Sequence, residues 1–341
     1  MSINISFNFY FGWKRSLVKK GQAKESECAT RQEPFIQVVM AEIERSSALC
    51  STSTTENRKT AVRAFQRFLL DSGEAAIGFR DVTADHVRAF ERWSLDRGLR
   101  LNYVRCNLRN LRAVVNRIDG RGRLLFEGVR TSNAQTDKRA IGEDDIRRLE
   151  ELRLPERSMR ALARNIFLFC FYAMGIPLID AAFLRKDQLR DGYILYYRHK
   201  THRQVKVKVV PRLREIIDSM ADEHSPYLLP ILTSDDRGKA MGQYRRFLQR
   251  YNRTLAGIAG EYMPGGRLTS YSPRHTWASI AFRKGISINV ISQALGHANT
   301  RTTQNYIRDI SGEQLDEANL TVIQGLDKGI EERRIVKKTK M

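Results

Sequence analysis

The feature that most constrains the fold is a polar interruption in an otherwise helical pattern. Apolar residues recur at helical spacing from about residue 34 to 130 and again from about residue 141. Between them, the stretch GVRTSNAQTDKRAIGEDDI lacks apolar periodicity. A chain of 341 residues is long enough for two domains. We therefore predict a helical domain over 34–130, a linker over 131–140 and a second domain over 141–325.

The two ends of the chain fit neither domain. Residues 3–11 alternate in a way that predicts a strand, and the remainder of 1–33 is basic and polar. The last segment, 326–341, is expected to be a basic, mobile tail. The N-terminal charge order does not fit a signal peptide, and no apolar run reaches the ~20 residues of a membrane span. These features favour a cytoplasmic protein that does not contact membranes.

The charge balance points to a partner. Lys and Arg number 59 against 38 Asp and Glu, which gives a formal net charge of +21. A nucleic-acid phosphate backbone is the partner that such a charge most often indicates, because each neutralised phosphate releases counterions. A ribosomal, membrane-surface or merely soluble basic protein would carry a similar charge. None of the four cysteines forms a C-x-x-C pair, and their spacing suits no zinc site. We expect a nucleic acid as the ligand and no metal.

One predicted helix carries a basic row. The segment LNYVRCNLRNLRAVVNRI, residues 101–118, places apolar side chains at helical spacing on a core stripe. Arg105, Arg109 and Arg112 lie at i, i+4 and i+7 on another face. Because this row contains no acidic residue for i,i+4 pairing, we expect these arginines to contact DNA phosphates. The members of the stripe are Leu101, Val104, Leu108, Leu111 and Val115.

The second domain combines helices with a small sheet. The apolar run within 165–174 predicts a buried core helix, and helical patterns return after Pro211. Between them, DGYILYYRHKTHRQVKVKVV alternates β-branched or aromatic residues with basic ones around a polar turn, which predicts a hairpin. The predicted fold class is therefore mainly α with a small β-hairpin in the second domain (α+β).

A series of motifs between residues 269 and 307 carries the chemistry. This series is similar to that of the tyrosine recombinase (phage integrase) family, in order and in spacing. It departs from the common pattern as some Bacteroides-type integrases do. The matching residues are Arg274-His275-Thr276, Leu295-Gly296-His297, Thr302-Thr303 and Tyr306.

The resemblance implies roles for these residues. Tyr306 would attack a DNA phosphate and form a 3′-phosphotyrosyl bond. Arg274 would bind the non-bridging oxygens, a task that suits a planar guanidinium that never deprotonates. His297 would hydrogen-bond the same phosphate or manage the tyrosine proton. The covalent bond stores the energy of the broken phosphodiester, so no cofactor is expected.

The family also uses a lysine on a hairpin to protonate the leaving 5′-hydroxyl. Lys200 lies at the turn of the predicted hairpin and fits that position. Lys206 and Lys208 compete with it, but the alternating pattern places both in a strand.

Two positions depart from the family pattern. Tyr271 stands where a His or Lys is usual; its hydroxyl can donate a hydrogen bond to phosphate but carries no charge. The first-box arginine position falls on Pro177, which has neither charge nor a backbone N–H. Our candidate to replace that arginine is Arg198, because i and i+2 share a face in a strand and Lys200 lies two residues on. Arg185 is the weaker candidate.

The resemblance further implies an assembly. The family forms a two-domain clamp on duplex DNA and works as a homotetramer on two sites, so we expect a monomer free in solution. Accessory DNA-bending proteins are possible further partners. Residues 310–326 carry apolar side chains that suit docking on a neighbouring subunit or on their own domain. The expected activity is that of a DNA invertase or mobile-element integrase.

Two other functions compete with this one. A catalytically degenerate relative would bind DNA without recombining it, and Pro177 is the best argument for that alternative. A type IB topoisomerase would share the chemistry without the need for a tetramer. Against degeneracy, Lys200, Arg274, His297 and Tyr306 are all present.

Overall fold

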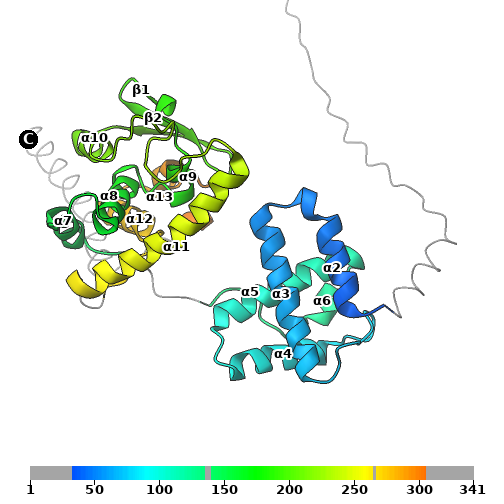
Figure 1. Ribbon diagram of the computed structural model, residues 1–341. Helices are drawn as coiled ribbons and strands as arrows, with labels where there is room; N and C mark the ends of the chain where they lie inside the picture. Colours follow the sequence, from blue (N-terminus) through cyan, green and yellow to red (C-terminus); the bar gives the residue numbers. More distant parts are fainter. Residues whose placement is uncertain (1–32, 135–139, 264–265, 305–341) are drawn as a thin grey trace, which may run out of the picture. The chain divides into compact units, whose positions relative to one another are not determined.

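The structure is a computed structural model that describes residues 33–134, 140–263 and 266–304 (Figure 1). The chain divides into two compact units, Met1–Thr136 and Asp137–Met341. Each unit has its own hydrophobic core, and each is described here by itself.

The first unit is helical throughout its described residues. Its core is rich in phenylalanine: Phe65 packs tilted or edge-on against Phe35, Phe68 and Phe90, with ring centroids 5.2–5.6 Å apart. Its helices are α2 (Phe35–Arg45), α3 (Thr52–Asp71), α4 (Ala84–Asp96), α5 (Leu101–Ile118) and α6 (Gly122–Leu125), with a 3₁₀ turn at Ser47–Leu49.

The helix predicted over 101–118 is confirmed as α5. Its stripe packs into the core as expected at Val104, Leu108, Leu111 and Val115, which are at most 1% exposed. Leu101 is an exception, since 38% of it is exposed. It is the first residue of the helix, so its side chain lies beyond the edge of the core.

The second unit packs helices around α8, and half of the 14 residues of α8 are buried. Helices α7, α10, α11 and α12 all contact α8 (Figure 1). The helices are α7 (Glu143–Glu151), α8 (Met159–Tyr172), α9 (Leu178–Ala182), α10 (Pro211–Asp218), α11 (Arg237–Tyr262), α12 (Ser272–Arg283), α13 (Ile288–Ala294) and α14 (Thr300–Gln304), with a 3₁₀ turn at Lys186–Gln188.

The predicted hairpin is confirmed, and it belongs to a three-stranded antiparallel sheet in the order β1-β2-β3. Strand β2 (Tyr193–Tyr197) pairs with β3 (Gln204–Lys208). The additional strand β1 (Leu189–Arg190) is only two residues long, too short for an alternating pattern to reveal. Alternate residues of β2 and β3 face the core, so the sheet is buried on one side. The fold is therefore mainly α with one small sheet, as predicted.

Candidate active site

Arg274 lies in the first turn of α12 and is 2% exposed. Its Nη1 donates a hydrogen bond to the carbonyl oxygen of Gly175 at 2.8 Å, and its Nη2 donates to the carbonyl oxygen of Leu295 at 2.6 Å. These carbonyls come from the segments before α9 and after α13. They orient the guanidinium without neutralising its charge, so a buried positive charge is held in a fixed place.

Gly175 makes this close approach possible. Its φ is +69°, and a Cβ added there would lie 3.0 Å from the Cα of Arg274. Any other residue would meet both the strain of a left-handed backbone and the crowding against Arg274. The glycine thus brings the backbone of its segment against the arginine.

His297 contacts Arg274 directly. Nη2 of Arg274 lies 2.9 Å from Nε2 of His297, and Nδ1 of His297 lies 2.8 Å from Oγ1 of the fully buried Thr303. Arginine can only donate, so Nε2 must be the acceptor and the proton of the neutral ring sits on Nδ1. Burial, followed by the nearby charges of Arg274, Arg198 and Lys200, lowers the pKa of His297 to about 4. The ring is therefore neutral at pH 7.

Arg198 extends from the end of β2 into the same site. The residue is 7% exposed, its Nε lies 2.7 Å from Oδ2 of Asp180, and its Nη1 donates to the carbonyl oxygen of Leu295. Since Arg274 also donates to Leu295, the two guanidinium groups converge on one carbonyl oxygen. Asp180 in addition accepts a hydrogen bond from the backbone N–H of His199 at 2.8 Å, which ties α9 to the hairpin.

Lys200 lies in the turn between β2 and β3 and is exposed. The premise that Arg198 and Lys200 lie in one strand is wrong. Arg198 follows Tyr196 onto the buried face, whereas Lys200 belongs to the turn, where strand alternation no longer applies. Lys206 and Lys208 lie in β3 with exposed side chains, as the alternation predicts.

The turn is fastened to the segment after α13. Oγ1 of Thr201 donates to the carbonyl oxygen of Gly296 at 3.1 Å, and Nη1 of Arg203 donates to that of His297 at 2.7 Å. The sequence assigned no role to Arg203 or Thr201, and Thr303 stood in a motif without a role of its own. The partners of Arg203 and Thr201 are backbone carbonyls more than 90 residues along the chain, which no motif marks.

The two departures from the family pattern lie at the starts of helices. Tyr271 precedes α12 and is 52% exposed, so its hydroxyl belongs to the surface of this region. Pro177 precedes α9 and is buried, with a φ of −64° that suits the helix start. Within the described residues, Arg198 is the arginine from outside α12 that shares a hydrogen-bond acceptor with Arg274.

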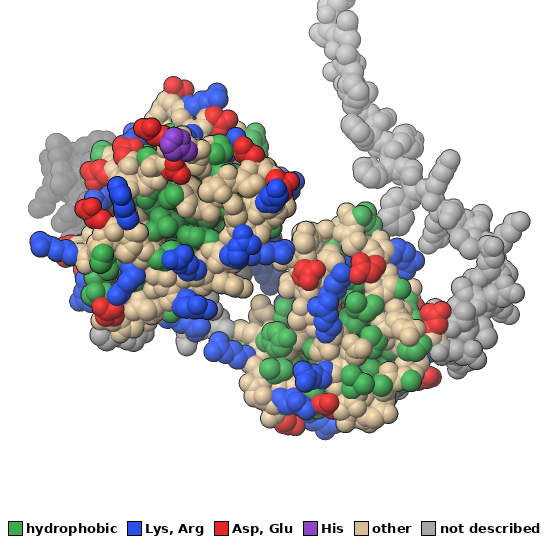
Figure 2. Space-filling view, viewed as in Figure 1, with side chains coloured by type: hydrophobic (Ala, Val, Ile, Leu, Met, Phe, Trp, Pro, Cys, Tyr) green, Lys and Arg blue, Asp and Glu red, His purple; other side chains and the backbone are tan. Residues whose placement is uncertain are grey.

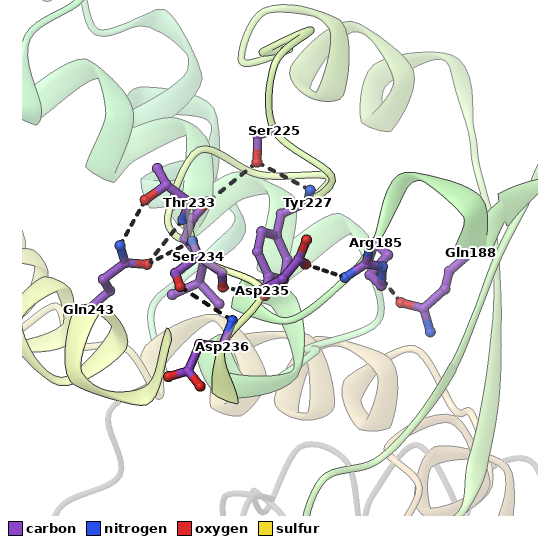
Figure 3. Close-up of polar contacts among 10 residues, drawn as sticks. Arg185, Gln188, Ser225, Tyr227, Thr233, Ser234, Asp235, Asp236 and Gln243 are labelled. Carbon is purple, nitrogen blue, oxygen red and sulfur yellow. Dashed lines mark hydrogen bonds and ion pairs between the residues drawn. The ribbon is translucent and has the colours of Figure 1, made fainter. Parts of the chain in front are cut away.

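Arg185 is engaged elsewhere. Its Nη1 lies 2.7 Å from Oδ1 of Asp235, and its guanidinium carbon lies 5.7 Å from the centre of the Tyr227 ring. Figure 3 shows Arg185 directed at the loop before α11; in that loop the backbone N–H of Thr233 donates to Oε1 of Gln243 on α11. The Arg185 side chain thus contacts Asp235 and Tyr227 of this loop.

Two arginines of the predicted basic row lie against the segment that follows α6. Arg105 and Arg109 donate hydrogen bonds to residues 131–133. None of the ion pairs between described residues includes Arg105, Arg109 or Arg112. Two of the three thus have backbone partners that helical spacing did not predict.

A second basic row, which was not predicted from the sequence, runs along α11. Lys239, Arg246, Arg250 and Arg253 are exposed and recur at i, i+7, i+11 and i+14, on one face of the helix. Lys and Arg side chains recur over the face of the second unit where α11 runs (Figure 2). The first acidic residue of α11 is Glu261, so the row has no acidic neighbour along its own helix. The sequence contains a signal for this row, because no acidic residue occurs in α11 before Glu261.

Several expectations concern residues outside the described part. Tyr306, the N-terminal strand over 3–11, the segment 310–326 and the tail 326–341 all lie there. Among the described residues, no group of three or more His, Cys, Asp or Glu is arranged to hold a metal ion. No described helix is long and apolar enough to cross a membrane.

Comparison with known proteins gives this arrangement a context. A family model described as Phage integrase family matches residues 142–311, and one described as Phage integrase SAM-like domain matches residues 34–117. Tyrosine recombinase XerC of Rickettsia massiliae is 26% identical over 149 residues, 43% of this chain and 47% of the relative. Tyrosine recombinase XerA of Pyrococcus furiosus is 25% identical over 190 residues, 54% and 62% respectively. The matches thus span about half the length of these relatives.

Solved structures share the fold at low identity. A lambda integrase dimer bound to a COC′ core site superposes with a TM-score of 0.63 at 14% identity, over 85% of this chain and 81% of that one. The Tn1549 transposon integrase in complex with a circular intermediate DNA gives 0.60 at 13% identity, over 85% and 99%. The two family models match the helical first unit and the second unit with its buried Arg274–His297 pair, and the chain belongs to the phage integrase family of tyrosine recombinases.

Proposed function

We propose that the protein is a site-specific DNA recombinase that cuts and rejoins duplex DNA through Tyr306. The phenol oxygen of Tyr306 attacks the phosphorus, a 3′-phosphotyrosyl bond forms, and the bond from phosphorus to the 5′-oxygen breaks. Lys200 gives its proton to the departing 5′-hydroxyl. The observation that carries the proposal is the buried Arg274, fixed by two carbonyls and in contact with a neutral His297.

Arg274 and His297 would act on the same phosphate. In the pentacoordinate transition state, negative charge grows on the non-bridging oxygens, and a donor that is already oriented stabilises it without reorganisation. With Nδ1 protonated and bound to Thr303, Nε2 of His297 is left as an acceptor. That lone pair accepts from Nη2 of Arg274, so it would receive the Tyr306 proton only once Nη2 has turned to the phosphate.

We further propose that Arg198 supplies the second cation that Pro177 cannot. Support comes from its burial, from the Asp180 ion pair that aims it and from the acceptor it shares with Arg274. Its guanidinium has five N–H donors, of which the Leu295 hydrogen bond uses one, while the Asp180 contact is an ion pair. Tyr271 would add an uncharged hydroxyl donor from the exposed start of α12.

DNA would be held by both units. The arginines of α5 and the basic row of α11 provide cations without acidic neighbours on their helices. A lambda integrase tetramer bound to a Holliday junction has the same fold, and we propose a homotetramer on two DNA sites for this chain. The proposed location is the cytoplasm, where the chain meets DNA as a monomer before it assembles.

Covalent capture tests the activity without knowledge of the target sequence. The full chain is incubated with a pool of nicked duplexes of random sequence, in which the cleaved fragment diffuses away and traps the intermediate. We expect a protein–DNA adduct that survives denaturing electrophoresis, and sequencing the trapped DNA identifies the site. Tyr306→Phe should form none.

The possible results separate the candidates. Wild type that binds DNA but forms no adduct would indicate the degenerate relative. An adduct that persists in Tyr306→Phe would mean that another residue is the nucleophile. Relaxation of supercoiled plasmid without exchange between two sites would favour a topoisomerase.

A further inference from the structure

The segment that follows α6 lies along α5 as an extended strap, defined here as residues 131–134. It contains no helix or strand, and Thr131 within it is buried. It belongs wholly to the first unit. Extended segments at the edge of a domain are poorly ordered unless something ties them down, so the contacts of the strap show what holds it in place.

Two arginines of the basic row hold the strap through backbone carbonyls. Nη1 of Arg105 donates to the carbonyl oxygen of Ser132 at 3.2 Å. Nη1 of Arg109 donates to the carbonyl oxygen of Thr131 at 3.1 Å and to Oδ1 of Asn133 at 3.2 Å. Each guanidinium is thereby fixed by its Nη1 nitrogen. The carbonyl and amide oxygens orient the charge but do not cancel it.

Asn102 fastens the end of the strap. Its Nδ2 donates to the carbonyl oxygen of Ala134 at 3.1 Å, and its Oδ1 accepts from the Ala134 N–H at 2.7 Å. A side-chain amide that pairs with both groups of one backbone unit fixes the position of that unit as a strand partner would. Asn102 therefore sets where the strap carbonyls stand relative to Arg105 and Arg109.

We infer that the strap is a built part of a phosphate-binding surface on α5, and that Asn102 and Asn133 are positioning residues for Arg105 and Arg109. A free arginine side chain loses rotamer entropy when it binds an anion. Here that ordering is complete before the ligand arrives, because the strap already holds both side chains. The ligand chemistry is the DNA backbone, so this inference rests on the proposed DNA-binding function.

The inference separates two effects that an alanine substitution usually mixes. Removing an arginine removes a charge, so it should lower the magnitude of the slope of log K against log salt by about 1. Removing a positioning asparagine leaves every charge in place. It should weaken binding while the salt slope stays the same, and this combination distinguishes a positioning role from a charged contact.

The experiment measures binding of the full chain to a labelled duplex oligonucleotide by fluorescence anisotropy over a series of salt concentrations. We expect Asn133→Ala, which removes one hydrogen bond, to raise Kd about three- to tenfold at unchanged slope. Asn102→Ala removes two hydrogen bonds and should raise Kd at least as much, again at unchanged slope. Arg109→Ala should raise Kd and lower the slope. Asn110→Ala is the matched control, because its amide bonds only within α5, to the Cys106 carbonyl at 2.8 Å.

Several results would overturn the inference. Wild-type affinity in both Asn102→Ala and Asn133→Ala would show that the strap does not order the arginines. Tighter binding would show that the strap competes with phosphate. Asn133→Ala guards against misfolding, since Asn133 is exposed and gives one acceptor only. If Arg109→Ala also leaves affinity and slope unchanged, the DNA-binding role of α5 fails together with the inference. If only the asparagine variants are unchanged, the positioning role of the strap is refuted and the DNA-binding role of α5 stands.

Discussion

Arg274 is held by two carbonyl oxygens, each of which accepts a hydrogen bond from a different nitrogen of the guanidinium. Lysine at this position keeps the charge but can reach only one of the acceptors, Gly175 or Leu295, that now lie 2.8 and 2.6 Å from different nitrogens. We expect Arg274→Lys to slow covalent adduct formation roughly 10²–10³-fold, the loss typical of one removed oxyanion donor. DNA affinity should change much less, because contacts elsewhere supply most of it.

A matched control for this prediction is Arg160→Lys. Arg160 is a partly exposed arginine of the same unit, paired with Glu261. Equal adduct rates for wild type and Arg274→Lys would show that Arg274 only supports the fold.

His297 gives the site a defined pH dependence. Its pKa lies near 4 in the folded protein and near 6.5 in the unfolded chain. Between these pH values the unfolded state therefore binds more protons than the folded state. The contribution of His297 to the free energy of unfolding is complete above pH 6.5 and is lost as the pH falls towards 4. From the two pKa values the loss is about 3 kcal/mol. Histidine NMR should show a neutral ring protonated at Nδ1 at pH 7.

The comparison that isolates this effect is hydrogen exchange of the α12 amides in wild type and in His297→Gln. The wild type should lose protection between pH 6.5 and 4 more steeply than the variant. Parallel pH profiles would mean that the ring titrates normally, which would contradict its buried contact with Arg274.

At this scale the sequence was informative where a side chain matches a motif and silent where a backbone atom is the partner. The spacing of the motifs selected Arg274 and His297, which the structure brings into contact. The Leu295 carbonyl, on which Arg274 and Arg198 converge, has no signature in residue type. The partner of Nδ1 of His297, Thr303, stood in a motif, but only the fold shows its distance.

Among the elements, the hairpin depends on one glycine outside it. Gly296 has a φ of +64°, and an added Cβ would lie 2.9 Å from Cγ of Arg198 and 3.0 Å from Cγ2 of Val205. We expect Gly296→Ala to destabilise the second unit by about 2 kcal/mol, from backbone strain and from displacement of the hairpin. Adduct formation should fall as well, since Arg198 moves with β2.

Gly257→Ala is the control for that substitution. Gly257 is in α11 with no atom within 4 Å of an added Cβ, so alanine there should be neutral or stabilising by up to about 1 kcal/mol. If Gly296→Ala matches this control in thermal unfolding, the contact between the hairpin and the segment after α13 is looser than the distances indicate.

Period-two alternation located β2 and β3 because one face of the sheet is buried and the other is exposed to solvent. The same rule failed at the turn. Alternation describes residues that stay in the strand, and Lys200 has left it, while Arg198 remains on the buried side. The sequence predicts helices after Pro211, but the basic row of α11 coincides with no family motif and stands out only once the bounds of the helix are known.

On the scale of the whole molecule, the separate cores of the two units explain why the apolar pattern stops and restarts. No core cluster of the described residues includes residues of both units, and the division between Thr136 and Asp137 lies inside the polar stretch. Polar residues there bury nothing, so composition alone reveals the interruption. The sequence pattern contains no information on what residues 131–134 contact, because a strap held through its backbone needs no particular side chains at most positions.

The presence of one basic row in each unit leads to a prediction about linkage. The rows on α5 and α11 would each bind phosphate weakly, and the chain between them turns the second contact into an intramolecular event. We expect a protein with a protease site inserted between residues 134 and 140 to lose about 10²-fold in DNA affinity once it is cut. Circular dichroism should show both units still folded, because each has its own core. The uncut protein with the same insertion is the control, and an unchanged Kd after cleavage would mean that one unit alone supplies the binding energy.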